Sequence, residues 1–181
     1  PGVMNEFKKK FPKRFFMEGV SEQSIIGLSA GLAMEGFKPY VNTIATFLTR
    51  RCFDQIVIDL CLHNLPVRLI GNGGGLVYAP LGPTHQAIED ISILRPIPNI
   101  SIIAPCDAFE MEKLLSQTKN LKKPIYFRIA KGGDRIITKK KEKIKYEKSS
   151  LKIVPKDYLL VSTGVMTQIA MNAAKKINIL K

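Results

Sequence analysis

Glu22 is the first residue whose position in the sequence suggests chemistry. It follows Gly19-Val20-Ser21 and begins a segment with a helical pattern whose other visible face is apolar. A carboxylate at the start of a helix can bind a polar group of a ligand, or it can only stabilise the helix through its dipole. Residue type and position alone favour the second interpretation, so Glu22 needs support from longer motifs.

His85 is the second candidate. It follows Gly82–Thr84 where a helix is expected to begin, and a neutral imidazole there could hydrogen-bond a substrate hydroxyl or carbonyl. A role in capping the helix is an equal alternative. The glycine-rich loop Gly71–Gly75 matches neither a dinucleotide-binding fingerprint nor a phosphate-binding loop. His63, at the end of an amphipathic pattern, is interpreted as structural.

The three cysteines suggest no metal or redox chemistry. Cys52, Cys61 and Cys106 are an odd number without metal-ligand spacing, so we expect small buried apolar residues in a reducing compartment. The chain begins Pro1-Gly2, with no charged region leading into an apolar stretch. This start argues against a signal peptide and for a missing true N-terminus. The cytoplasm is the expected location, and no metal ligand is predicted.

The composition indicates a globular protein with a strong positive charge. Of 181 residues, 45% are hydrophobic, and no apolar run approaches the ~18 residues of a membrane span, so no membrane partner is expected. Lys and Arg number 28 against 15 Asp and Glu, and the net charge of +13 could indicate a polyanionic partner. Six lysines fall in Lys139–Lys148, however, and only seven residues are arginines, on which nucleic-acid readers usually rely. We therefore expect no nucleic acid partner.

Short β-type runs alternate with helical patterns along the chain. Strands are expected at 39–44, 67–71, 100–104 and 125–129, and helices at 22–35, 47–64, 85–94 and 107–116. This alternation predicts an α/β fold, a mainly parallel sheet with helices on both faces. Ligands of such sheets bind at the carboxyl ends of the strands, so four loops are expected to converge there. These loops are 18–22, 45–51, 72–85 and 130–134.

The pattern changes after residue 138. We expect a first domain at 1–138 and a solvated, lysine-rich linker or edge hairpin at 139–156. A strand at 158–164 and a helix at 166–179 then predict that 157–181 is the start of a second α/β domain.

Longer sequence motifs favour a functional role for Glu22 and His85 over the structural roles given above. They are Phe11-Pro12-x-Arg14-Phe15-Phe16 with Gly19–Gln23, Thr46–Leu48 with Phe53–Ile56, Gly82–Gln86 with Glu89-Asp90, and Ser162–Gly164. Together they resemble the pyrimidine-binding domain of the transketolase family of thiamine diphosphate enzymes, over nearly the whole chain. The resemblance implies that 1–138 is this domain and that 157–181 begins the family's C-terminal domain.

The resemblance implies a role for each matching residue at the cofactor. Glu22 would be catalytic, because the family's glutamate hydrogen-bonds the pyrimidine nitrogen and promotes loss of the thiazolium C2 proton. Phe47 would stack on the pyrimidine ring. The pocket arginine is Arg50 if the alignment is anchored on Thr46-Phe47, and Arg51 if it is anchored on Asp54-Gln55.

At the substrate, the chain departs from the family. His85 matches a histidine that meets the sugar near the reacting carbon, which implies catalytic and substrate-binding roles. Lys131 stands where relatives carry an arginine for the sugar phosphate, so the charge is kept and the bidentate fork is lost. Leu81 replaces an aspartate that contacts substrate hydroxyls, and Gly73–Gly75 replaces a histidine or arginine. Substrate preference is therefore expected to differ.

One half of the family's active site has no counterpart in the sequence. The family holds the diphosphate and Mg²⁺ through a Gly-Asp-Gly…Asn pattern, and no Gly-Asp-Gly occurs here. The resemblance therefore implies an N-terminal transketolase subunit as the partner that holds diphosphate and metal, in a dimer or heterotetramer.

The resemblance implies transfer of a two-carbon ketol unit between sugars or sugar phosphates. The alternatives within the family are a deoxyxylulose-phosphate synthase and a 2-oxo acid dehydrogenase beta subunit, which use pyruvate-type donors. A noncatalytic basic binding protein is the alternative from another class, and a steep salt dependence of nucleic acid binding would favour it.

Overall fold

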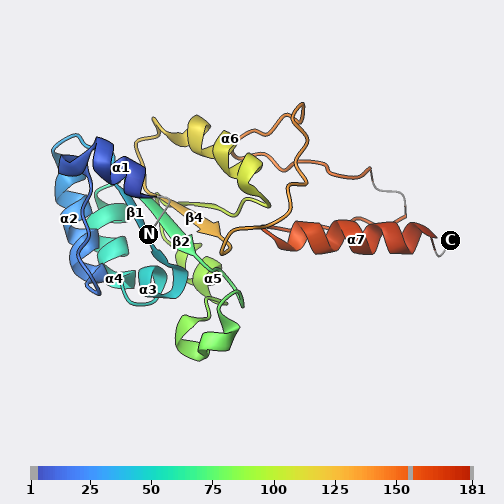
Figure 1. Cartoon of the computed structure of the whole chain (residues 1–181), viewed down its shortest axis with the longest axis horizontal. Helices are drawn as coiled ribbons and strands as arrows, with labels where there is room; N and C mark the ends of the chain where they lie inside the picture. The colour runs from blue at the N-terminus through green and yellow to red at the C-terminus, as the bar shows by residue number, and fades with distance from the viewer. Residues whose placement is uncertain (1–3, 155–156, 180–181) are drawn as a thin grey trace.

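The centre of the molecule is a four-stranded parallel sheet. The computed structural model describes residues 4–154 and 157–179 (Figure 1). The strands are β1 (Tyr40–Ile44), β2 (Arg68–Asn72), β3 (Ser101–Ile103) and β4 (Ile125–Ile129), in the order β1-β2-β4-β3. The register places Gly71 of β2 beside Thr43 of β1 and Arg128 of β4. The predicted α/β fold is confirmed.

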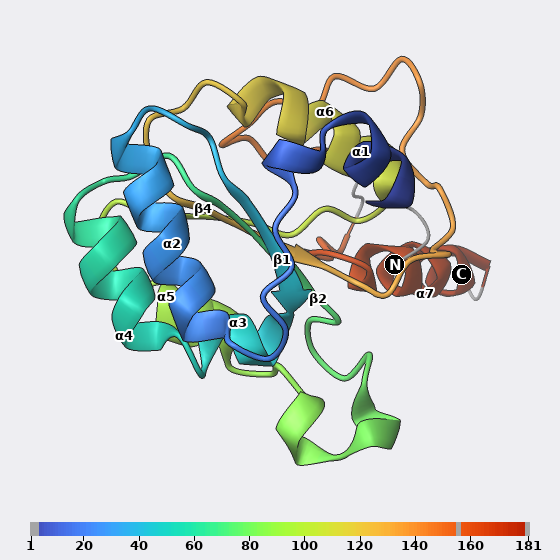
Figure 2. The same cartoon turned by 60° about the vertical axis from the view of Figure 1, so that its left-hand side comes forward.

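Helices cover both faces of this sheet, as Figure 2 shows. One face carries α2 (Glu22–Met34), α3 (Ala45–Thr49), α4 (Phe53–Gln55), the π-helix η3 (Ile56–Leu62) and α5 (Asp90–Leu94). Its core consists of fully buried apolar side chains, among them Ile26, Leu48, Ile56, Leu60, Leu69 and Leu94. Each such side chain stabilises the fold by about 1.5–3 kcal/mol, so this core fixes the helices on which the candidate residues lie.

The opposite face is covered by α6 (Ala108–Thr118), which packs on Ile125 and Phe127 of β4. The start of α6 is held by reciprocal hydrogen bonds between side chains and backbone. The Asp107 carboxylate accepts a hydrogen bond from the Glu110 N–H at 2.8 Å. The Glu110 carboxylate in turn accepts from the N–H of Cys106, one residue before the N-cap Asp107.

The prediction of a single helix at 47–64 is wrong, because the segment forms α3, a turn, α4 and η3. The Thr49 hydroxyl donates to the Ala45 carbonyl at 2.8 Å, and the Cys52 thiol lies 3.4 Å from the Phe47 carbonyl. Side-chain donors thus compete for carbonyls at the end of α3, which favours a break. The break puts Arg50 and Arg51 in a turn.

The helix predicted at 85–94 begins later than expected. His85 ends the 3₁₀ helix η5 (Pro83–His85), which follows η4 (Ala79–Leu81), and α5 begins only at Asp90. Between them, Ala87 pairs with Gly75 through two backbone hydrogen bonds of 2.8 and 3.0 Å. This pairing needs an extended backbone, so the helix cannot include Ala87.

Within the described residues, the two ends of the chain contain three more helices and lack one expected strand. The helices are α1 (Asn5–Lys10), η2 (Pro12–Arg14) and α7 (Met166–Ile179). Residues 157–164 form no strand, which makes that prediction wrong. An apolar run becomes a strand only by pairing with a neighbouring strand, and the sheet described above does not include this run.

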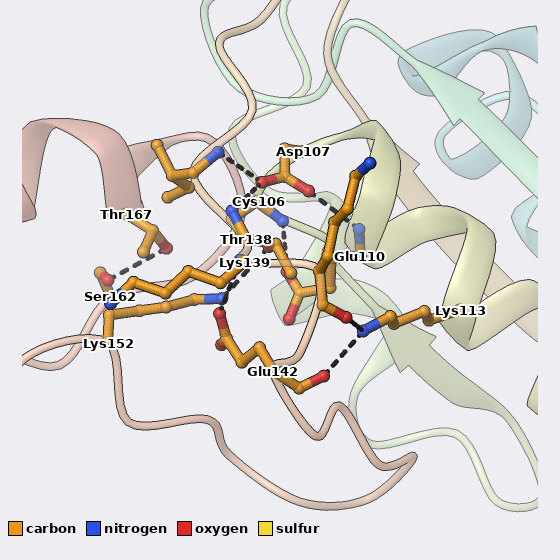
Figure 3. A network of polar contacts seen from close by, with 12 residues as sticks. Cys106, Asp107, Glu110, Lys113, Thr138, Lys139, Glu142, Lys152, Ser162 and Thr167 are labelled. Atoms are coloured by element: carbon orange, nitrogen blue, oxygen red, sulfur yellow. Dashed lines mark hydrogen bonds and ion pairs between the residues drawn. The ribbon is translucent and has the colours of Figure 1, made fainter.

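The segment that follows residue 136 is attached to α6 (Figure 3). The Asp107 carboxylate accepts from the N–H groups of Ile137 and Thr138 at 2.8 and 2.7 Å. The ammonium group of Lys113 donates to the Glu142 carbonyl at 2.7 Å, and Ile144 is buried against α6. The lysine-rich segment was expected to be solvated, but its described part up to Lys152 has these anchors. Residues 155–156 lie outside the described residues, and the domain boundaries stay predictions.

Candidate functional site

The Glu22 carboxylate lies at the first turn of α2 and is almost completely buried, with 7% of its side chain exposed. The preceding Ser21 does not cap the helix, because its hydroxyl donates to the Glu18 carbonyl. The partner of Glu22 is the Arg51 guanidinium, whose Nη1 lies 2.5 Å from Oε2. A buried carboxylate is thus directed toward the turn between α3 and α4.

Phe47, on α3, joins this pair to His85. The guanidinium carbon of Arg51 lies 4.3 Å from the centre of the Phe47 ring. The His85 ring lies edge-on to Phe47, with 5.0 Å between ring centres and 66° between ring planes. We call Glu22, Phe47, Arg51 and His85 the site cluster. Three of the four loops that were expected to converge do so here.

The two neighbouring arginines point to different carboxylates. Arg50 forms an ion pair with Glu89 and donates to the Gln86 carbonyl at 3.1 Å, whereas Arg51 pairs with Glu22. Burial alone would raise the pKa of Glu89, but the hydrogen bond and charge of Arg50, together with backbone hydrogen bonds, outweigh burial and lower this pKa. The geometry agrees with the alignment anchored on Asp54-Gln55. The roles of both arginines in cofactor binding stay predictions.

The imidazole of His85 is partly exposed and held by its neighbour. The Thr84 hydroxyl lies 3.0 Å from Nδ1, with the donor set by the tautomer. Nε2 is the remaining nitrogen, and it could bond a ligand. Lys131 is exposed beyond the end of β4, at the same edge of the sheet. Among the contacts of the described residues, none joins Lys131 to the site cluster, so the structure does not bring it to the other candidates.

The sequence did not indicate a buried hydrogen-bond network that lies next to the glycine loop Gly71–Gly75. The Asp90 carboxylate is fully buried, and its Oδ2 accepts from Tyr126 Oη and Arg128 Nε, both at 2.8 Å. Burial and then the charge of Asp90 raise the pKa of Tyr126. Arg128 in the otherwise apolar strand β4 is the sequence signal that could have indicated the network, because a buried arginine requires a carboxylate or carbonyl partner.

The glycine loop lies directly on this network. A Cβ at Gly74 would lie 2.6 Å from Cγ of Arg128, and one at Gly71 would lie 2.6 Å from Tyr126. The N–H groups of Gly73 and Gly74 donate to the Ile129 carbonyl at 2.9 and 3.1 Å. Close backbone approach, rather than phosphate binding, therefore accounts for these glycines.

The cysteines are buried and free, as expected. Burial raises the pKa of the Cys52 and Cys61 thiols to about 11, so neither is a thiolate nucleophile near neutral pH. In the described part of the chain, no group of three or more His, Cys, Asp or Glu could hold a metal ion. Within the same residues, no helix has the length and apolar character needed to cross a membrane.

Comparison with known proteins identifies the family. Residues 2–133 match the family described as "Transketolase, pyrimidine binding domain". The chain belongs to the transketolase family. The matched segment of this transketolase-family chain includes the sheet and the whole site cluster.

This transketolase-family chain is similar to curated proteins over nearly its whole length. It is 42% identical over 175 residues to a 1-deoxy-D-xylulose-5-phosphate synthase of Clostridium perfringens strain SM101, covering 96% of the chain and 28% of that protein. It is 34% identical over 176 residues to a transketolase family protein of Sinorhizobium fredii, covering 96% of the chain and 50% of that protein. The chain therefore spans no more than half the length of either relative.

Solved structures agree with the transketolase-family assignment. A structure described as a split gene transketolase in an inactive β4 tetramer superposes with a TM-score of 0.85 at 30% identity, over 96% of this chain and 56% of that one. A transketolase of Campylobacter jejuni superposes with a TM-score of 0.59 at 24% identity, over 63% of this chain and 18% of that one. The second similarity supports the fold alone.

Transketolase-family domains depend on thiamine diphosphate, and the site cluster fits the pyrimidine half of that cofactor. An aminopyrimidine ring is bound by a flat apolar surface and by a hydrogen-bonding group at its edge. The Phe47 ring offers the surface, and the buried Glu22 carboxyl lies close enough to share the Arg51 guanidinium with it. These two residues could therefore hold the ring.

Proposed function

We propose that this chain supplies the pyrimidine side of a thiamine diphosphate site in an enzyme that transfers a two-carbon ketol unit between sugars or sugar phosphates. The observation that carries the proposal is the buried Glu22 carboxylate at the start of α2, whose partner Arg51 lies over the ring of Phe47. A helix-start acid that only complements the helix dipole has no need of burial or of an adjacent aromatic ring.

Each side chain then has a defined task. When bound, thiamine diphosphate supplies a thiazolium carbon acid that becomes a nucleophile toward a carbonyl group. Glu22 hydrogen-bonds the pyrimidine nitrogen through its carboxyl group when the cofactor is bound. Phe47 positions the ring and excludes water from one of its faces. His85 hydrogen-bonds the substrate near the reacting carbon through Nε2.

The remaining parts of the site are proposed on a partner. The diphosphate and Mg²⁺ would be held by an N-terminal transketolase subunit, with a dimer or heterotetramer as the working unit in the cytoplasm. This proposal is supported by the similarity to a split gene transketolase, of which the chain covers 56%. Lys131 and Arg50 would contribute positive charge for a phosphorylated sugar.

A deoxyxylulose-phosphate synthase is the second candidate function. The 42% identity to such an enzyme over 96% of the chain favours it. Leu81 bears on substrate preference under either function, because it is 57% exposed on η4 and its side chain offers no hydrogen bond to a sugar hydroxyl. Poor turnover of xylulose 5-phosphate is therefore expected, and product analysis with a ketose phosphate and with pyruvate separates the two functions. A normal rate with xylulose 5-phosphate would contradict the role given to Leu81.

The Glu22→Gln substitution tests the proposed function. Glutamine keeps the shape of the side chain and loses the proton, so exchange of the cofactor C2 proton should slow by ~10²–10⁴-fold in the assembled enzyme. The exchange is measured by NMR after dilution into D₂O. Glu35→Gln at the other end of α2 is the matched control, because Glu35 is exposed. Unchanged exchange in Glu22→Gln would remove Glu22 from this role.

A further inference from the structure

Arg51 makes two contacts that match the needs of an aminopyrimidine ring. Its Nη1 donates to the Glu22 carboxylate at 2.5 Å, and its guanidinium carbon lies 4.3 Å from the centre of the Phe47 ring. A guanidinium group is flat, donates hydrogen bonds in its plane and stacks on aromatic faces. An aminopyrimidine is also flat, with its hydrogen-bonding groups in the plane of the ring. Both groups therefore require the same carboxylate and an aromatic face.

We propose that Arg51 is a displaceable competitor for the pyrimidine position, so that the cofactor ring binds only when the guanidinium leaves Glu22 and Phe47. This inference rests on the proposed function and deepens it. It assigns Arg51 a role opposite to the cofactor-binding role that the family resemblance implies. Arg51 lowers the affinity for the cofactor, and Glu22 exchanges a cationic partner for a ring nitrogen.

The surroundings of Arg51 allow such a movement. The residue lies in the turn between α3 and α4, its side chain is 39% exposed, and among the described residues its guanidinium has no hydrogen-bond acceptor besides Glu22. Its backbone is held separately, because the Gln23 amide donates to the Arg51 carbonyl at 3.2 Å. The side chain can therefore rotate away while the turn keeps its position.

Arg68 shows what a fixed arginine looks like in the same fold. It is fully buried in β2, and its guanidinium donates to the carbonyl groups of Thr118, Leu121 and Lys123. Among the described residues, Arg51 has one hydrogen-bond acceptor and one aromatic ring as partners, and its partly exposed side chain makes both contacts weaker than those of a buried arginine. A cofactor that binds through its diphosphate as well can displace contacts of this strength.

The first test compares cofactor affinity in the full-length protein assembled with the chain that supplies the diphosphate site. Thiamine diphosphate is titrated with Mg²⁺ present, and binding is followed by calorimetry. Arg51→Met keeps the length of the side chain and removes both contacts, so affinity should rise by ~5–20-fold. Arg135→Met removes the same charge from an exposed position and should leave the affinity unchanged. Equal or weaker binding by Arg51→Met would overturn the inference.

The second test uses chemical replacement of the side chain. In Arg51→Ala, low millimolar guanidinium chloride should compete with thiamine diphosphate and reverse the gain in affinity, whereas sodium chloride at the same ionic strength should not. A purely structural role of Arg51 would give no selective competition by guanidinium, and that outcome also contradicts the inference. Thermal unfolding of both variants confirms that they are folded.

The outcomes separate the inference from the proposed function. If the wild-type protein binds thiamine diphosphate and Arg51→Met binds it more weakly, only the competitor role fails. If neither protein binds it, the proposed function fails, and the competitor role fails with it because there is no ring to displace.

Discussion

Asp90 is a buried charge on which the loops around the site cluster depend. Its Oδ2 bonds both Tyr126 and Arg128, and the Arg128 guanidinium also donates to the Ala87 carbonyl beside the glycine loop. Arg128 is 18% exposed and Asp90 is fully buried. Loss of the negative charge leaves a largely buried cation unpaired, which costs more than loss of a neutral hydrogen bond.

Asp90→Asn should therefore lower the free energy of unfolding by about 3 kcal/mol, measured by urea denaturation of the full chain. Tyr126→Phe is the comparison, because it removes one hydrogen bond to the same oxygen and should cost only about 1 kcal/mol. Equal losses in the two variants would show that the charge of Asp90 is not what stabilises the network.

The site cluster was largely predictable from the sequence at the level of residues. Motifs indicated Glu22, Phe47 and His85, and the structure brings their side chains together. Spacing did not show which of Arg50 and Arg51 faces Glu22, because the two motifs on either side of them align with the family one residue apart. The turn between α3 and α4 lies at this point. Arg128 was missed because its partner Asp90 lies 38 positions away in the chain.

At the scale of elements, strand β2 and helix α2 contain glycines with opposite requirements. A Cβ at Gly71 of β2 would lie 2.6 Å from the buried ring of Tyr126, whereas one at Gly27 of α2 would meet no atom within 4 Å. Gly71→Ala should lower the free energy of unfolding by about 2 kcal/mol through overpacking. Gly27→Ala should raise it by about 0.5–1 kcal/mol, since alanine favours the helix.

Thermal unfolding of both alanine variants checks this pair of predictions, and each serves as the control for the other. If Gly27→Ala is destabilised, the space beside Gly27 on α2 is filled in solution by another surface that the added methyl group would contact. A neutral Gly71→Ala would mean that Tyr126 moves without loss of its hydrogen bond to Asp90.

The elements themselves were predictable where a periodic pattern decides their form. The four strands of the sheet agree with the apolar runs, and burial is greatest in the two central strands, β2 and β4. The break within the helix predicted at 47–64 could not be predicted. Apolar spacing does not show that the Thr49 hydroxyl donates to the Ala45 carbonyl. The strand at 158–164 also failed, because an apolar run carries no information about its pairing partner.

At the scale of the whole molecule, Asp107 attaches the segment after β4 to α6 (Figure 3). Burial alone would raise the pKa of Asp107, but the backbone N–H donors of Glu110, Thr138 and Ile137 outweigh it and lower this pKa. A carboxylate with a lowered pKa in the folded state contributes stability above its unfolded pKa of about 3.9. This contribution is lost as the pH falls through the folded-state pKa.

Glu142 adds to the dependence of stability on pH. Burial would raise its pKa, but the hydrogen bond of 2.5 Å from the Lys152 ammonium group, the backbone N–H of Lys139 and the charge of Lys152 together outweigh burial and lower the pKa. The Asp107 carboxylate joins this segment to the start of α6, and the Glu142 carboxylate joins Lys152 to the rest of the segment, so acid weakens both contacts. Acid should release this segment before the main core unfolds, because the core of the opposite face contains neither group.

Asp107→Asn tests this account of the molecule. Asparagine can still accept hydrogen bonds at the start of α6 but carries no charge, so the variant should be about 1 kcal/mol less stable at pH 7. It should also lose less of its stability than the wild type between about pH 5 and pH 3. Hydrogen exchange at the amides of Ile137 and Thr138, measured across this pH range, reports the local attachment directly. Parallel pH dependence in the two proteins would show that Asp107 does not control attachment, and faster exchange throughout α2 would show that acid acts on the whole fold instead.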